Sequence, residues 1–238
     1  RVDGLILAST GRNQESRIQK ELTSFQALNI PVVLISRSLP NTDFDIVELD
    51  NRESAYQVTR YLIKKGHRRI AIISGPVQTS AAQERIDGYM KAHDEARLPF
   101  EQNLIHMGGA TVESGYRLTK KLLNQKYRPT GIFVGSNFQL IGVLRATKEL
   151  NIKIPEDLSV VGFHDSDWIS FASPPLTIVT PDMQRYSKLT VDLLFERIGG
   201  AYSGKARNYK LPTKMIIRDS VKKIAPNMQK SEIISEAV

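Results

Sequence analysis

Cysteine is absent from this chain, and aromatic residues are few. None of the 238 residues is a cysteine, one is a tryptophan, and aromatic residues make up 7% of the sequence. The chain can therefore form no disulfide and offers no thiolate nucleophile or thiolate metal ligand, although this does not fix a compartment. It also lacks an apolar run near the roughly 18 residues that a membrane span requires, and it lacks a basic-then-apolar leader. We therefore expect a soluble, unexported, cytoplasmic protein without a membrane partner.

The remaining composition is that of an ordinary globular protein. Hydrophobic residues make up 41% and charged residues 24% of the chain, which is long enough for two lobes. The net charge is +8, but lysine and arginine are spread along the chain, with short runs such as Lys64-Lys65 and Arg68-Arg69. We expect a solvated basic surface and no direct contact of this chain with DNA.

Short β-branched runs alternate with segments of helical periodicity. This alternation predicts an α/β fold with parallel sheets built from βαβ units. The expected strands are 2–8, 32–35, 46–49, 70–74, 104–107, 131–134 and 158–163. The expected helices are 15–27, 52–65, 83–96, 113–124, 138–150 and 183–198.

A polar cluster follows the expected strand at 158–163. If this apolar run is a parallel strand, the residues after it lie at the carboxyl end of the sheet, where open α/β folds bind ligands. These residues include His164, Asp165, Asp167 and Trp168. On spacing alone, an equally good interpretation is that the aspartates are turn residues and Trp168 fills the core. The cluster indicates a ligand site only together with further evidence.

Enzyme motifs are missing from the sequence. There is no Gly-x-Ser-x-Gly elbow, no P-loop and no Gly-x-Gly-x-x-Gly, and the histidines, His67, His93, His106 and His164, lack metal-ligand spacing. No carboxylates form a recognisable acid/base pair. We expect neither catalysis, nor a metal, nor a cofactor.

The segment from Ile154 to Thr177 resembles a signature of the LacI/GalR family of transcriptional regulators, "IPeDlsvvGfDd" followed by "PPLT". Further segments resemble other family motifs in the same order along the chain: 2–7 ("vDGlIl"), 31–37 ("iPvVliDR"), 50–51 with 66–70 ("DN…GHrrIa"), 85–89 ("R…Gy"), 111–115 ("T…sG") and 211–220 ("lp…l..R.S"). Because the motifs cover nearly the whole chain in order, the match is far more specific than any one of them.

The resemblance implies a two-lobed fold of the type I periplasmic-binding-protein kind. The chain would cross between lobes near 49–51, 177–181 and 206–211, giving an N-terminal lobe of 1–49 with 181–205 and a C-terminal lobe of 50–179 with 207–222. Residues 225–238 are expected to be a mobile tail. Family members carry a helix-turn-helix headpiece, a hinge helix and two strand-helix units ahead of the first motif. We therefore expect an N-terminal lobe that is incomplete in this chain and a sequence that belongs to a longer regulator.

The same resemblance predicts effector contacts in the cleft. Arg85 matches a family arginine whose planar fork suits paired hydroxyls or a carboxylate; the alternative is a surface ion pair. Thr79 and Ser80 lie in the preceding loop, where their hydroxyls either reach the ligand or are solvated.

Two further positions follow the expected strand at 131–134. Asn137 is matched to the asparagine of the family motif "ND..AiG", either as a ligand contact or as a cap of the next helix. Phe138 is taken to stand where the motif has aspartate, which removes an acceptor and adds a stacking surface.

His164 stands where many sugar-binding members have the first aspartate of "DD", and Asp165 keeps the second. An imidazole can donate a hydrogen bond and carries no negative charge, so the cleft becomes less acidic. An effector with an anionic group, such as a sugar phosphate or sugar acid, is therefore expected more than for the average family member. The alternative is a solvent-facing His164. Trp168 either stacks on a sugar ring or packs at the hinge.

We therefore expect the effector-sensing and dimerisation domain of a LacI-type regulator. It would bind a small sugar-like metabolite between its lobes and act on operator DNA through a headpiece outside this chain. A homodimer is expected, with Leu140, Ile141, Leu144 and Leu150 as candidates for its face or for the core. The rival hypothesis is a periplasmic or lipoprotein sugar receptor of a transporter, which shares the fold.

Overall fold

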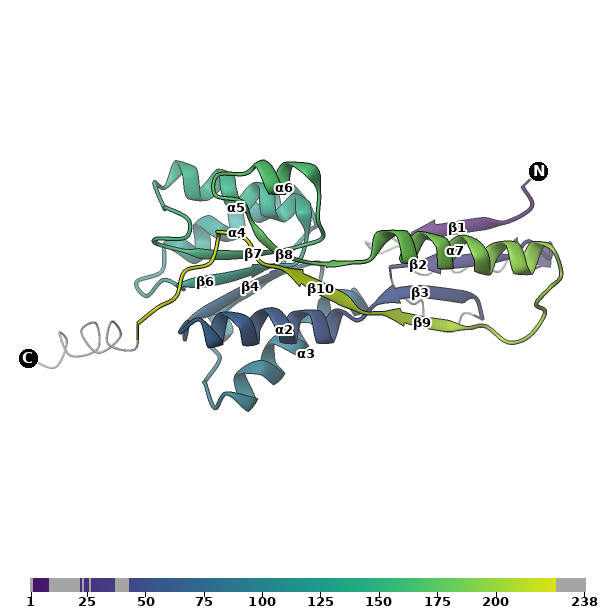
Figure 1. Cartoon of the computed structure of the whole chain (residues 1–238), viewed down its shortest axis with the longest axis horizontal. Coiled ribbons are helices and arrows are strands. Elements are labelled where there is room, and N and C mark those ends of the chain that lie inside the picture. The colour runs from purple at the N-terminus through teal and green to yellow at the C-terminus, as the bar shows by residue number, and fades with distance from the viewer. Residues whose placement is uncertain (1, 9–21, 23, 26, 37–42, 226–238) are drawn as a thin grey trace, which may run out of the picture.

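Two sheets, one parallel and one mainly parallel, organise the chain, each in its own lobe (Figure 1). The computed structural model describes residues 2–8, 22, 24, 25, 27–36 and 43–225. Residues 226–238 of the expected tail and most of the expected helix at 15–27 lie outside these residues. Within the described ranges, no helix combines the length and apolar character needed to cross a membrane.

The smaller sheet has the strand order β1-β2-β3-β9, and all of its strands run parallel. Its strands are β1 (Leu5–Ala8), β2 (Val32–Ile35), β3 (Asp45–Leu49) and β9 (Asn208–Leu211). One long helix, α7 (Met183–Ile198), covers a face of this sheet (Figure 1). Leu193 and Leu194 of α7 pack with Val33 and Val47 in the core of this lobe, as an amphipathic helix on a parallel sheet should.

The larger sheet has the order β10-β8-β7-β6-β4-β5, with β10 antiparallel to β8 and the other strands parallel. Its strands are β4 (Ile70–Ser74), β5 (Ile105–Met107), β6 (Gly131–Val134), β7 (Ser159–Phe163), β8 (Thr177–Pro181) and β10 (Thr213–Ile216). Strands β4, β6, β7 and β8 are buried along their whole length. This burial explains why they read as continuous apolar runs in the sequence.

Helices cover both faces of the larger sheet (Figure 1). One face carries α2 (Asn51–Lys64) and α3 (Ser80–Glu95), and the other carries α4 (Val112–Leu123), α5 (Asn137–Glu149) and the short α6 (Asp167–Phe171). A 3-10 turn, Gln102–Leu104, precedes β5. The α/β fold with parallel sheets flanked by helices is thus confirmed.

Glycine allows α4 and α5 to cross at backbone distance. A Cβ atom added at Gly142 would lie 2.1 Å from the carbonyl oxygen of Val112 and 2.4 Å from the amide nitrogen of Tyr116. No side chain fits such a gap, because both neighbours are backbone atoms that cannot rotate away. The crossing fixes the middle of α5 against the first turns of α4.

The chain passes between the lobes at three points. Asp50 follows β3 and caps α2, Asp182 follows β8 and caps α7, and Pro212 separates β9 from β10. The first and third passages are tied together, because Asp50 N donates to Leu211 O at 2.9 Å. All three passages are short.

The third passage lies later than the sequence suggested. The expected boundary at 207 would assign β9 to the C-terminal lobe, but β9 pairs with β3 in the smaller sheet, from Ile46↔Asn208 to Leu49↔Leu211. Residues 177–181 likewise form the buried strand β8, and the chain leaves the larger sheet only at its end. The assignment of residues to lobes otherwise stays a prediction.

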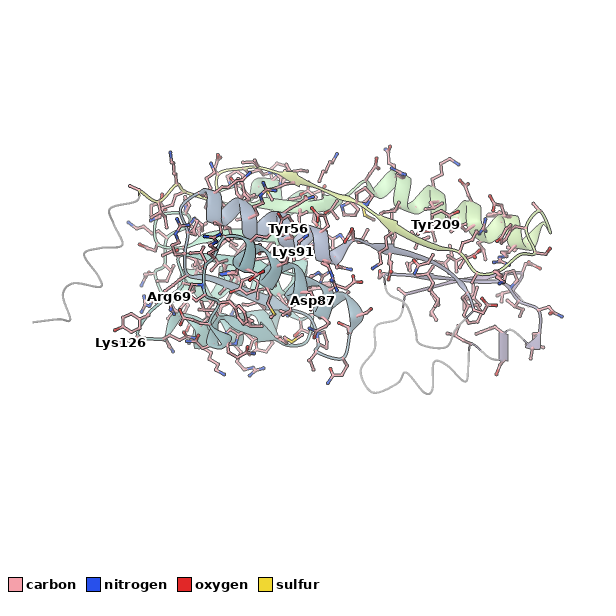
Figure 2. All side chains as sticks on the ribbon, turned by 90° about the horizontal axis from the view of Figure 1, so that it is seen from below. Tyr56, Arg69, Asp87, Lys91, Lys126 and Tyr209 are labelled. Carbon is pink, nitrogen blue, oxygen red and sulfur yellow. The ribbon has the colours of Figure 1, made fainter. Side chains whose placement is uncertain are left out.

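Several cations on the surface of the larger lobe have local aromatic or acidic partners. Tyr56 of α2 and Lys91 of α3 lie together on the outer face of the larger lobe (Figure 2), with the ammonium 4.5 Å from the ring centroid. Arg69 pairs with Glu101, and the Lys126 ammonium lies 5.1 Å from the ring of Tyr127. These cations have local aromatic or acidic partners, which is typical of a solvated surface.

Candidate functional site

A cavity of about 360 Å³ lies at the carboxyl ends of the central strands. It is the position at which open α/β sheets bind ligands. Its lining residues come from both lobes and are Ser36, Gly75, Pro76, Thr79, Ala81, Arg85, Ala110, Gly135, Ser136, Asn137, Phe138 and His164. The size suits a small metabolite.

Arg85 reaches this cavity from α3. Its guanidinium carbon lies 4.2 Å from the centroid of the Phe163 ring, so the cation sits over an aromatic face at the end of β7. A Cβ atom at Gly135 would lie 3.3 Å from Cδ and Nη1 of Arg85, so the absence of a side chain there leaves room for the arginine. The structure therefore brings Arg85 to the cavity as the sequence predicted.

His164 also lines the cavity, directly after β7. Its backbone has a φ of 68°, its N–H donates to Val179 O at 2.8 Å, and its ring meets Phe163 edge-on at 4.6 Å. Burial, helped by the positive charge of Arg85, lowers the pKa of His164 to about 4. The imidazole is therefore neutral at pH 7, with one donor and one acceptor nitrogen.

Asn137 lines the cavity, but its amide is engaged within the protein. With the nitrogen turned toward the carbonyl groups, it donates to Phe163 O at 2.8 Å and His164 O at 3.2 Å, while its oxygen accepts from Ser166 Oγ at 2.8 Å. The N-cap of α5 is Ser136, so Asn137 does not cap that helix. Asn137 instead fastens the segment that carries His164.

The register of the "ND..AiG" motif needs one correction. Its asparagine stands six positions before its glycine, and counted back from Gly142 that position is Ser136. The motif aspartate then falls on Asn137, and Phe138 lies one residue beyond. An amide still replaces a carboxylate here, so the expectation of a less acidic cleft is unchanged, but Phe138 replaces no aspartate. Its side chain, 61% exposed, lines the cavity as an apolar wall.

The two hydroxyls expected in the loop before α3 differ in position. Thr79 lines the cavity and caps α3, accepting from Ala82 N at 3.3 Å while its hydroxyl donates to Pro76 O at 2.9 Å. Ser80 is the first residue of α3 and does not line the cavity. Thr79 thus fixes the start of the helix that carries Arg85.

Asp165 and Trp168 lie away from the cavity. Asp165 Oδ2 accepts from Arg218 Nη2 at 2.9 Å and Oδ1 accepts from Ser166 N at 3.1 Å, so this carboxylate orders its own loop. Trp168 of α6 packs against the core of the larger lobe and faces a separate, open hollow of about 1220 Å³. Although both follow His164 closely in sequence, the chain turns them to other sides.

Sequence reasoning did not single out Ser36 as a site residue. It follows β2 in the smaller sheet, has a φ of 74°, and its N–H donates to Tyr186 Oη at 3.0 Å. Its position directly after a buried strand was the available signal. Because Ser36 belongs to the smaller lobe, the cavity is lined from both lobes.

Arg85 is the charged residue among the described residues that line the cavity, and none of these lining residues is an aspartate or glutamate. His164 is neutral at pH 7 for the reason given above. A guanidinium in such a position can form paired hydrogen bonds with a carboxylate or a phosphate group.

Comparison with known proteins places this geometry in a family. The family model described as "Periplasmic binding protein-like domain" matches residues 59–221. The HTH-type transcriptional repressor PurR of Haemophilus influenzae strain PittEE is 32% identical over 226 residues, which are 94% of this chain and 66% of that protein. The chain thus spans just under two thirds of the length of this relative.

Solved structures agree with the sequence comparison. The transcriptional regulator CelR in complex with cellobiose superposes with a TM-score of 0.82 at 30% identity, over 92% of this chain and 66% of that one. The transcription regulator CcpA of Lactococcus lactis has a TM-score of 0.82 at 27% identity, over 93% and 79%. The resemblance to LacI/GalR effector domains is confirmed, and the chain belongs to the periplasmic binding protein-like domain family in its LacI type.

Proposed function

We propose that this chain is the effector-sensing domain of a LacI-type transcriptional regulator. It binds a small sugar-like metabolite that carries an anionic group, in the cavity between its two lobes, and acts in the cytoplasm. Operator DNA is bound through a helix-turn-helix headpiece outside this chain. The observation that carries the proposal is the cavity lined by Ser36 from one lobe and by Arg85 and His164 from the other.

The relatives favour a regulator over a receptor of a transporter. PurR of Haemophilus influenzae is a transcriptional repressor, and CelR is a transcriptional regulator whose structure contains cellobiose. Both align with more than nine tenths of this chain. By analogy with the CelR complex, we infer that the effector of this chain is a carbohydrate-like compound.

The anionic group is favoured by the charge of the cavity. The Arg85 fork suits a carboxylate or phosphate, and the neutral His164 can donate one further hydrogen bond. No carboxylate lines the described cavity wall to accept hydrogen bonds from a neutral sugar. Phe138 offers an apolar face for the C–H groups of a sugar ring.

A homodimer is supported by an apolar surface on the larger lobe. Phe171 of α6 is 85% exposed and Ile141 of α5 is 37% exposed, and Leu144 and Trp168 border the hollow beside Phe171. Leu140 is fully buried and Leu150 packs against the core, so these two belong to the fold. A second copy of this chain would cover the exposed aromatic and aliphatic side chains.

Regulation then follows from linkage. The metabolite contacts both lobes, so it favours the relative lobe angle in which both sets of contacts form. A dimer transmits that angle to the spacing of two headpieces, which must match two half-sites on DNA. The three short passages at Asp50, Asp182 and Pro212 are where that angle can change.

A thermal-shift screen followed by calorimetry tests the proposal. A cognate ligand at a hundredfold excess over its dissociation constant adds about 2.7 kcal/mol, which raises the Tm of a chain of this length by about 5–10 °C. Glucose 6-phosphate and gluconate are then compared with glucose and cellobiose by isothermal titration. The proposal requires at least about tenfold tighter binding of an anionic member. Tighter binding of the neutral sugars would contradict the anionic effector, and binding of none of a broad set of sugars and sugar acids would contradict the sensing function.

A further inference from the structure

Gln139 occupies an unusual environment at the start of α5. Ser136 followed three residues later by Gln139 is the sequence signature of a capping box, in which glutamine bonds back to the N-cap amide. In the structure Ser136 makes no side-chain cap hydrogen bond, and Gln139 is completely buried. Its amide points away from its own helix end and into tertiary structure.

The Gln139 amide nitrogen contacts three backbone carbonyl groups. Nε2 lies 3.0 Å from Ser74 O, 3.1 Å from Gly109 O and 3.4 Å from Gly108 O. An amide has two N–H donors, so the three acceptors share them. Ser74 ends β4, and Gly108 and Gly109 follow β5. One side chain therefore joins the carboxyl ends of two neighbouring strands to the start of α5.

The backbone of Gln139 is itself held in place. A Cβ atom at Gly115 of α4 would lie 2.1 Å from Gln139 O and 2.6 Å from its Cα, so the two helices touch through backbone at this residue. The backbone of Gln139 therefore cannot move closer to α4. The side chain spans the distance from this helix contact to the two loops.

The joined loops form one wall of the cavity. The loop after β4 supplies Gly75, Pro76 and Thr79, and the loop after β5 supplies Ala110. Thr79 in turn caps α3, which carries Arg85. Movement of the Ser74 carbonyl would therefore reach both the wall and the helix that bears the cationic group.

We propose that Gln139 is a positioning residue of the effector cavity. It touches no cavity space itself but holds the loops after β4 and β5 at the separation that sets the shape of the wall and the place of Arg85. Its effect on effector affinity rests on the function proposed above, whereas the clamp on the two loops does not depend on any ligand.

Hydrogen exchange of single amides tests the clamp. Gln139→Leu is a substitution close in size that removes both donors of the side chain. Two backbone amides report on the loops: Gly108 N donates to Ser74 O at 3.2 Å, and Thr111 N donates to Gly109 O at 2.8 Å. Both amides should exchange at least about tenfold faster in this variant than in the wild type. If Gln139→Leu does not fold, Gln139→Asn replaces it. The shorter asparagine side chain cannot reach the carbonyl groups of the two loops, so the same faster exchange of both amides is expected.

Thr119→Val is the matched control. Thr119 is fully buried in the neighbouring α4, and its hydroxyl donates to Gly115 O at 2.7 Å without touching either loop. The control should lower global stability while leaving the exchange of Gly108 and Thr111 unchanged relative to other amides of the lobe. Equal acceleration in both variants, or none in either Gln139 variant, overturns the proposal.

Affinity supplies the second readout. The ligand is glucose 6-phosphate or gluconate, whichever binds the wild type more tightly. Its dissociation constant should rise at least about tenfold in Gln139→Leu and less than about twofold in Thr119→Val. An equal loss in both variants overturns the positioning role. If the wild type binds neither compound, the proposal of an anionic effector fails. The amide exchange data then test by themselves whether Gln139 holds the two loops in place.

Discussion

Acidification should destabilise the larger lobe through His67. This ring is completely buried, with Nδ1 2.9 Å from Thr130 Oγ1 and Nε2 3.3 Å from Lys222 O, and burial lowers its pKa to about 4. A histidine with a depressed folded-state pKa stabilises the fold fully above its unfolded value of 6.5, and this stabilisation is lost as the pH falls toward 4. The side chain joins the start of β4 to β6 and the C-terminal segment, so its protonation acts on the centre of the lobe.

The magnitude follows from the two pKa values. Protonation linkage with 6.5 unfolded and about 4 folded gives a loss of about 2 kcal/mol between pH 7 and pH 5, and about 3 kcal/mol once the pH is well below 4. The loss at pH 5 corresponds to a decrease in Tm of about 4–8 °C for a chain of this length.

Urea denaturation monitored by tryptophan fluorescence measures this loss of stability in the larger lobe, because Trp168 is the single tryptophan and lies beside the larger sheet. Wild type and His67→Gln are compared at pH 7 and pH 5, so that the other histidines cancel in the difference. The wild type should lose about 2 kcal/mol more than the variant. Equal losses, or an imidazole NMR titration of His67 centred near 6.5, would refute the reasoning.

Three further predictions concern packing, charge and assembly. Gly142→Ala should destabilise the fold by about 1–3 kcal/mol, because its methyl group meets the carbonyl of Val112; an unchanged urea midpoint would contradict the close helix crossing. Arg85→Met should raise the pKa of His164 from about 4 by removing the neighbouring positive charge, and an NMR titration that shows no upward change would contradict that electrostatic coupling. Phe171→Asp should convert a dimer into monomers in light scattering at micromolar concentration, and a dimer that persists would place the interface elsewhere.

Much of the fold was predictable because its signals are local. The strands at 70–74 and 131–134 and the helix at 183–198 have the bounds that the sequence predicts. Each is either a fully buried apolar run or an amphipathic helix, and such patterns are visible within one segment. Strand β9 was missed because Asn208, Tyr209 and Lys210 are exposed on an edge strand. Pairing with β3, which lies far away in sequence, makes this segment a strand.

The site was predictable to the extent that topology alone determines it. Arg85, Asn137 and His164 come from separate segments, yet each follows the end of a parallel strand, and such ends meet at one edge of the sheet. Asp165 and Trp168 do not join them, since the direction of a side chain in an irregular loop depends on backbone angles that the sequence does not show. Ser36 also directly follows a buried strand, β2, but a single serine between Ile35 and Arg37 carries no other signal of a ligand site.

The most direct test of the account is an amide NMR titration with the compound that gives the largest thermal shift. The account predicts that the strongest chemical-shift changes occur at Ser36 in the smaller lobe and at Gly135, Phe138 and His164 in the larger lobe, at the same ligand concentration. Changes confined to one lobe, or centred on Trp168 and Phe171, would contradict a ligand site between the lobes.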